Sequence, residues 1–291
     1  MAEIRSPAAI GFYRPDAKSL REQIEWAFQH RLGPRRLPQV NPHGLHRLLG
    51  LVSPHAGYQY SGPAAACGYA ALAEEGRPET VVMIGPNHHG LGKPLAVSDA
   101  EGWRTPLGVA QCDIELAQAI AKAVPGAELD SRAHREEHSL EVQVPFLQYL
   151  FGEEVRLVAL ALQFHLPDTP EVLGQALAKV LSGRQVVLIA STDMTHQEPQ
   201  EVAAAQDQKA LEAMLRLDPP GLLEVVRRQR ISMCGSEPTA LVISACRALG
   251  ATRAELLKYH SSGDTEPGMN WVVGYASVAI WKDPGGAGTG E

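Results

Sequence analysis

The chain has 291 residues, 45% of them hydrophobic, and a formal net charge of −7. This suffices for one large α/β domain, and we expect a single domain over residues 1–284 followed by a flexible tail at residues 285–291. Acidic and basic residues are mixed along the chain, which excludes a broad basic surface for nucleic acid. No apolar stretch approaches the roughly 20 residues that cross a bilayer, and the N-terminus lacks a secretory signal. We therefore expect a cytoplasmic protein without a membrane partner.

Helix-like and strand-like segments alternate along the chain without a repeat. In chain order the helix-like segments are residues 19–29, 63–75, 113–123, 170–181, 198–217 and 237–249. The strand-like segments are residues 47–52, 80–84, 155–162, 185–190, 254–259 and 271–280. Alternation of this kind predicts a mostly parallel sheet with helices on both faces.

Possible metal ligands stand where buried apolar runs give way to Gly- or Pro-rich turns. His55 follows one such run, His88 and His89 follow another, and Cys234 lies in a turn-like segment. Open α/β sheets usually bind ligands at the carboxyl ends of their strands. Two imidazoles and a thiolate could hold a transition metal ion there, although a histidine in such a turn can also be structural. Because neighbouring side chains diverge, we expect one of His88 and His89 to face the metal, and spacing alone does not choose between them.

Three further polar residues follow other predicted strands. Asp193 and His196 are three apart after the apolar run 186–190. They fit an N-cap and its neighbour on one helix face, or an acid/base histidine with a carboxylate that orients it. Asp264, in a turn after the strand-like segment 254–259, either lines the same crevice or makes a tight turn.

His138 and Glu141 form another pair three residues apart. Their segment is not the metalloprotease signature HExxH, because Arg135 stands where that signature requires Glu. They fit either a polar helix start or the lining of the pocket.

Several motifs together resemble the MEMO family, known in microbes as AmmeMemoRadiSam system protein B. The resemblance runs from about residue 9 to residue 281, in the order of the family. The segments that carry it are residues 11–13 (GFY), 53–58 (SPHAGY), 85–89 (GPNHH), 105–108 (TPLG), 137–143 (EHSLEVQ), 193–196 (DMTH), 234–235 (CG) and 261–264 (SSGD).

The resemblance implies a three-layer α/β/α sandwich similar to the class III extradiol ring-cleavage dioxygenases, which are nonheme iron enzymes. It implies metal ligation by His55, His88 and Cys234, with Asp193 and His196 in the pocket and His196 at the acid/base position. His89, His138, Glu141 and Asp264 are further pocket-lining candidates. The family name also implies a radical SAM enzyme as a partner.

Three functions from different classes fit these residues. The first is a metal-dependent, dioxygenase-like oxidoreductase acting on an unknown small molecule. A thiolate ligand departs from the two histidines and one glutamate of the dioxygenases, and we expect iron(II) or copper rather than zinc. The second is a zinc hydrolase with His196 or Glu141 as the base. The third is an adaptor whose pocket binds a peptide or a small anion without turnover.

Overall fold

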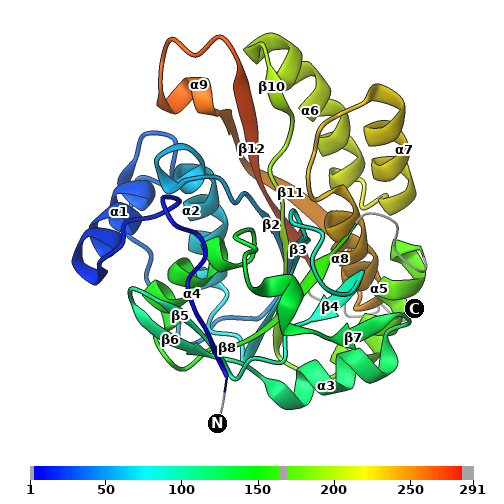
Figure 1. Cartoon of the computed structure of the whole chain (residues 1–291). Coiled ribbons are helices and arrows are strands. Elements are labelled where there is room, and N and C mark those ends of the chain that lie inside the picture. Colours follow the sequence, from blue (N-terminus) through cyan, green and yellow to red (C-terminus); the bar gives the residue numbers. More distant parts are fainter. Residues whose placement is uncertain (1–2, 164–168, 284–291) are drawn as a thin grey trace, which may run out of the picture.

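The computed structural model describes residues 3–163 and 169–283 (Figure 1). Its centre is a nine-stranded sheet with the strand order β10-β12-β2-β9-β3-β8-β4-β7, in which β11 also pairs with β12. These strands are β2 (Leu48–Ser53), β3 (Thr80–Pro86), β4 (Leu95–Val97), β7 (Ala127–Leu129), β8 (Arg156–Leu162), β9 (Val186–Ser191), β10 (His196–Glu198), β11 (Arg253–Ser261) and β12 (Val272–Trp281).

The middle of the sheet is parallel, and an antiparallel strand pairs with it on each side. Strands β2, β9, β3 and β8 pair in parallel, while β12 against β2 and β4 against β8 are antiparallel pairs. Parallel strands buried on both faces read as continuous apolar runs, which is why the sequence identified them. The carboxyl ends of β2, β3 and β9 lie together at the upper edge of the sheet (Figure 1).

Helices cover both faces of the sheet and make a three-layer α/β/α sandwich. One face carries α1 (Ala17–Gln29), α2 (Tyr58–Glu74) and α4 (Val144–Phe151) (Figure 1). The other face carries α3 (Ile114–Ala123), α5 (Pro170–Leu181), α6 (Gln200–Leu215), α7 (Pro219–Gln229) and α8 (Ser236–Ala248). A short helix, α9 (Ser262–Thr265), joins β11 to β12.

Each face of the sheet has its own hydrophobic core. Leu51 and Met83 point into the core under α2, whereas their neighbours Val52 and Ile84 point into the core under α8. This alternation follows from the period of two in a β-strand. Each strand in the middle of the sheet therefore contributes apolar side chains to both cores.

A smaller three-stranded sheet joins the N-terminal segment to the body of the protein. It contains β1 (Ile4–Arg5), β5 (Gly102–Thr105) and β6 (Gly108–Gln111), in the order β1-β5-β6. Residues 6–16 then run past the carboxyl ends of the central strands before α1 begins. Asp16 caps α1 by accepting a hydrogen bond from the backbone N–H of Ser19.

Most of the predicted elements are present, with ends shifted by a few residues. All the predicted helices and strands form, and three further helices of the described residues, α4, α7 and α9, were not predicted. The Pro219–Pro220 pair starts α7, because proline suits the first turn of a helix, where its missing N–H is not needed. The predicted tail at residues 285–291 lies outside the described residues. Within the described residues, no helix combines the length and apolar character that crossing a membrane requires.

Candidate metal centre

His55 lies in the turn between β2 and α2, and its surroundings fix which ring nitrogen is free. The Ser191 hydroxyl donates its one proton to the backbone oxygen of Ser139, at 2.7 Å. It therefore accepts the proton of His55 Nδ1, which lies 2.9 Å away. The lone pair of the imidazole is then on Nε2, the tautomer that a metal ligand requires.

His88 follows β3 and is held in the same way by a carboxylate. Its Nδ1 lies 2.9 Å from Glu137 Oε1, and its backbone N–H donates to Glu137 Oε2 at 2.6 Å. Glu137 is 1% exposed and also accepts the backbone N–H of Ser139. A carboxylate often accepts the N–H of the ring nitrogen that does not bind metal in a histidine ligand. This contact fixes the orientation of the ring and its tautomer. Here too Nε2 is left free.

His138 brings a third imidazole to the same place. Its ring centroid lies 4.8 Å from that of His88 and 5.5 Å from that of His55. One ring nitrogen from each of the three histidines lies within 4.8 Å of the other two, a spacing at which they could hold a metal ion. Phe12, from the N-terminal segment, stacks on the His138 ring with centroids 4.3 Å apart. The sequence predicted His138 only as a pocket-lining residue.

Burial keeps two of these imidazoles neutral. Burial, together with the neighbouring His88, lowers the pKa of His55 to about 3. Burial also lowers the pKa of His138 to about 4, with His55 acting in the same direction. A neutral imidazole has a lone pair to donate, so both rings are in the form that binds metal.

Cys234 approaches His55 from the loop before α8. Its Sγ lies 3.3 Å from His55 Nε2 and accepts the backbone N–H of Asp193 at 3.3 Å. Burial raises the pKa of this thiol to about 12, and the Asp193 carboxylate adds to the rise. Gly235 makes this approach possible, because a Cβ at that position would lie 2.6 Å from the backbone oxygen of Ser191. The thiol predicted as a ligand is thus beside one predicted imidazole.

Asp193 and His196 lie on the neighbouring loop after β9. Asp193 Oδ1 accepts the backbone N–H groups of His55 and Ala56, at 2.8 and 3.3 Å, and Oδ2 lies 4.0 Å from His55 Nε2. Burial raises the pKa of this carboxyl group. His196 is half-buried and its Nδ1 lies 2.9 Å from the backbone oxygen of Ser232, which leaves Nε2 free. No helix begins at Asp193, so the alternative of a helix cap is excluded: His196 starts β10 and α6 begins at Gln200.

The remaining candidates lie in different environments. Glu141 is fully buried, and its carboxylate accepts hydrogen bonds from Arg5, Tyr13 and the backbone N–H groups of Ala8 and Ala9. Asp264 accepts the backbone N–H of Ser261 and caps α9. His89 is exposed. The structure thus gives Glu141 and Asp264 roles in holding the backbone, and it gives His88 rather than His89 a buried carboxylate partner.

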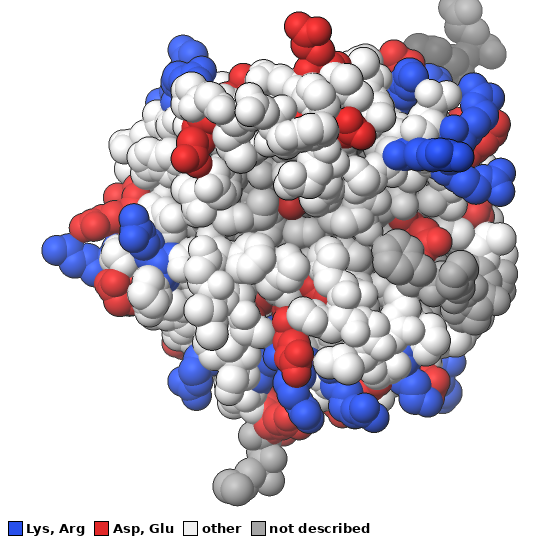
Figure 2. Space-filling model, turned by 45° about the horizontal axis from the view of Figure 1, so that its top comes forward, with Lys and Arg blue, Asp and Glu red and all other residues white. Residues whose placement is uncertain are grey.

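Sequence reasoning missed Glu137 and Phe12, which contact the imidazoles directly. Glu137 was part of a quoted motif, and its position next to His138 was the available signal. The face that holds these loops is largely uncharged at its centre, with charged side chains gathered around its rim (Figure 2).

The fold and this arrangement together define an α/β/α protein with a candidate metal site at the carboxyl ends of its central strands. A family model described as Memo-like protein matches residues 5–279. The chain belongs to the Memo family, as the sequence predicted.

Curated relatives agree with this assignment, and a solved structure agrees with the fold. A MEMO1 family protein of Methanopyrus kandleri is 48% identical over 279 residues, covering 95% of this chain and 98% of that protein. A MEMO1 family protein of Ignicoccus hospitalis is 45% identical, covering 94% of this chain and 98% of that protein. The crystal structure of an uncharacterized Escherichia coli protein matches with a TM-score of 0.56 at 15% identity, covering 80% of this chain and 100% of that one, and it supports the fold alone.

Proposed function

We propose that this protein is a metal-dependent oxidoreductase that acts on a small molecule not yet identified. The observation that carries the proposal is the group of three imidazoles, His55, His88 and His138, whose ligand atoms lie within 4.8 Å of one another. The Cys234 thiol lies against the first of these rings. We assign His55 and His88 as ligands and regard His138 and Cys234, which both lie near His55, as alternative or additional donors.

The donor chemistry fits a transition metal ion. Imidazole nitrogen suits iron, copper and zinc, while a thiolate favours softer ions such as copper(I) and zinc. Bound iron(II) or copper would supply redox chemistry at this site. The buried thiol needs to lose its proton before it binds metal, so copper or zinc binding through Cys234 would release a proton.

The chain's own residues can position the substrate and move a proton. Asp193 ties the backbone of His55 and Ala56 and so holds the first imidazole in place. His196 Nε2 is free and its ring is half-buried, so it can take a proton from a substrate and return it to water. Phe12 covers one face of His138 and limits the access of water from that side.

A second function, metal-assisted hydrolysis, is favoured by one observation. Three histidines around an open position are a known donor set for catalytic zinc. In that case His196 would act as the base towards a water molecule, and no oxygen would be consumed. Glu141 does not suit this role, because Arg5, Tyr13 and two backbone N–H groups already occupy its carboxylate.

The test is the metal content of anaerobically purified protein, measured for the wild type and for the variants His138→Ala and Cys234→Ala. Iron or copper near one ion per chain, together with oxygen uptake in screens with phenols and thiols, would support the oxidoreductase. Zinc without oxygen uptake would replace it with the hydrolase. Failure to retain any of the three metals after reconstitution would overturn both functions and leave an adaptor that binds a peptide or an anion.

A further inference from the structure

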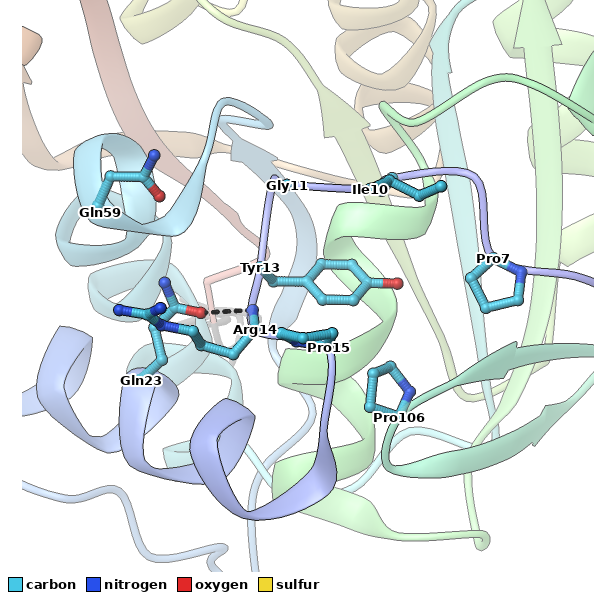
Figure 3. Close-up of a pocket in the computed structure, with 10 residues that line it drawn as sticks. Pro7, Ile10, Gly11, Tyr13, Arg14, Pro15, Gln23, Gln59 and Pro106 are labelled. Atoms are coloured by element: carbon cyan, nitrogen blue, oxygen red, sulfur yellow. Dashed lines mark hydrogen bonds between the residues drawn. The ribbon is translucent and has the colours of Figure 1, made fainter.

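A hollow on the outer side of the N-terminal segment contains none of the candidate metal ligands. Its cavity volume is about 540 Å³, within the range of small-molecule sites. Tyr13 forms its floor, and the segment that carries Tyr13 also carries Phe12, which faces His138. The hollow and the candidate metal centre therefore adjoin the same segment but are different sites. Its lining residues are Pro7, Ala9, Ile10, Gly11, Tyr13, Arg14, Pro15, Gln23, Gln59 and Pro106 (Figure 3).

Prolines and hydrogen bonds to the protein interior restrict the walls of this hollow. Proline supplies three of its lining residues, and a proline ring fixes the backbone angle φ. The Tyr13 hydroxyl donates to the buried Glu141 carboxylate, which also accepts the backbone N–H groups of Ala8 and Ala9. The floor and one wall are thus pinned to the protein interior, so the hollow does not depend on a ligand to form. A preformed, mostly apolar cavity is typical of small-molecule sites.

The two ends of the hollow differ in polarity. Around the Tyr13 ring lie Ile10 and Pro106, with Pro7 beyond the hydroxyl (Figure 3). The other end carries Arg14 and two glutamine amides (Figure 3). Ile10 is 88% exposed, an unusual position for a large apolar side chain. One end therefore offers apolar surface, and the other offers hydrogen-bond donors and a positive charge.

Arg14 is the single charged residue in the lining, and its guanidinium is unpaired. Its backbone N–H donates to the side-chain oxygen of Gln23 at 2.9 Å. Its guanidinium makes no hydrogen bond or ion pair with any residue of the ranges 3–163 and 169–283. A free cation beside an apolar cavity favours a ligand that carries one negative charge next to an apolar body.

We infer that this hollow binds a small amphiphilic anion, with a ring or alkyl body on Tyr13 and the prolines and an acidic group at Arg14. A single guanidinium suits one carboxylate or sulfonate better than a polyphosphate, which gathers several cations. The inference goes beyond the proposed function and does not depend on it, because no lining residue belongs to the metal centre.

The test uses two fluorescent probes of similar shape, anilinonaphthalene sulfonate, which is anionic, and phenylnaphthylamine, which lacks the sulfonate. Both are titrated into the full chain, and sedimentation gives its oligomeric state. Arg14→Gln removes the charge and keeps the length of the side chain. Gln59→Trp fills the hollow from its exposed rim. Arg21→Gln, an exposed position on α1 outside the lining, is the matched control.

We expect each probe to bind once per chain. Arg14→Gln should weaken the binding of the anionic probe by up to about fivefold, as when a solvent-exposed ion pair is lost. The affinity for the neutral probe should stay unchanged. Added salt should weaken the binding of the anionic probe but not that of the neutral probe. Gln59→Trp should abolish the binding of both probes, and Arg21→Gln should leave both affinities unchanged. Equal affinities in the wild type and Gln59→Trp, or no selective effect of Arg14→Gln, would overturn the inference. A dimer that Gln59→Trp dissociates would overturn it too, by identifying the hollow as a self-association surface.

Discussion

Two buried glutamates four positions apart, Glu137 and Glu141, hold different parts of the molecule. Glu137 accepts hydrogen bonds from the ring and backbone of His88 and so supports the candidate metal centre. Glu141 pairs with the Arg5 guanidinium at 2.5 Å and fixes the N-terminal segment. Arg5 also connects the two, because its Nη2 donates to the backbone oxygen of Glu137 at 2.6 Å.

The difference lies in the partners. The main partner of Glu137 is a histidine, which is free to bind metal through its other nitrogen. The partner of Glu141 is an arginine, which is always charged and has no acceptor to offer a metal or a substrate. Two buried carboxylates can thus have different roles: Glu137 supports the candidate metal centre, and Glu141 anchors the N-terminal segment. Variants at each position should separate these roles.

The largest effect is expected on protein stability, from the variant Glu141→Gln. The amide leaves the buried Arg5 charge without a carboxylate and turns an NH₂ group towards neighbouring donors. We expect the free energy of unfolding to fall by about 3–5 kcal/mol, as when a buried ion pair is broken. Urea denaturation measures it, with Glu136→Gln, at an exposed position in the same segment, as the control. A loss as small as that of the control would mean that Glu141 does not anchor the segment.

The next effect concerns metal retention by variants of the two adjacent histidines. Both side chains are exposed, but His88 Nδ1 lies 2.9 Å from the buried Glu137 carboxylate, whereas His89 has no such partner among the described residues. We expect His88→Ala to lose most of the bound metal and His89→Ala to keep it. Elemental analysis after reconstitution with one equivalent of metal decides between them. Equal losses in the two variants would remove His88 from the ligand set.

Glu137→Gln should lower the affinity for metal, although all the ligand residues remain present. The amide cannot accept every N–H that now points at the carboxylate, so the His88 ring loses its orientation. We expect the affinity for metal to fall by roughly 10-fold to 100-fold. Competition with a chromophoric chelator measures it, again with Glu136→Gln as the control. An unchanged affinity would show that Glu137 plays no part in metal binding.

The smallest effect is expected from Cys234→Ser, because three imidazoles remain. Serine keeps the size of the side chain and replaces a soft donor with a hard one. We expect the affinity for copper(I) to fall more than the affinity for zinc, measured by competition under anaerobic conditions. Cys67→Ser, a half-buried cysteine on α2, is the control. If both metals bind to Cys234→Ser as they do to the wild type, the thiol is not a ligand.

The sequence by itself determined the longer strands and the residues at their ends. The runs before His55, His88 and Asp193 are apolar because the middle strands are buried on both faces. Turn-forming residues after each run marked where the strand stops. These signals are local, so the candidate imidazoles could be found before the fold was known. The helix α4 was missed because it is short, with eight residues, and directly follows a separate 3₁₀ segment, Glu141–Gln143.

Only the tertiary structure decided which side chains meet. Cys234 and His55 are 179 positions apart, and Glu137 and His88 are 49 apart. The spacing of residues within one segment carries no information about contacts with a segment so far away in the sequence. The same holds for Glu141, whose motif suggested a pocket and whose partners lie in the N-terminal segment. Sequence patterns report the period and the ends of single elements, whereas the donor set depends on how the loops after different strands pack against each other.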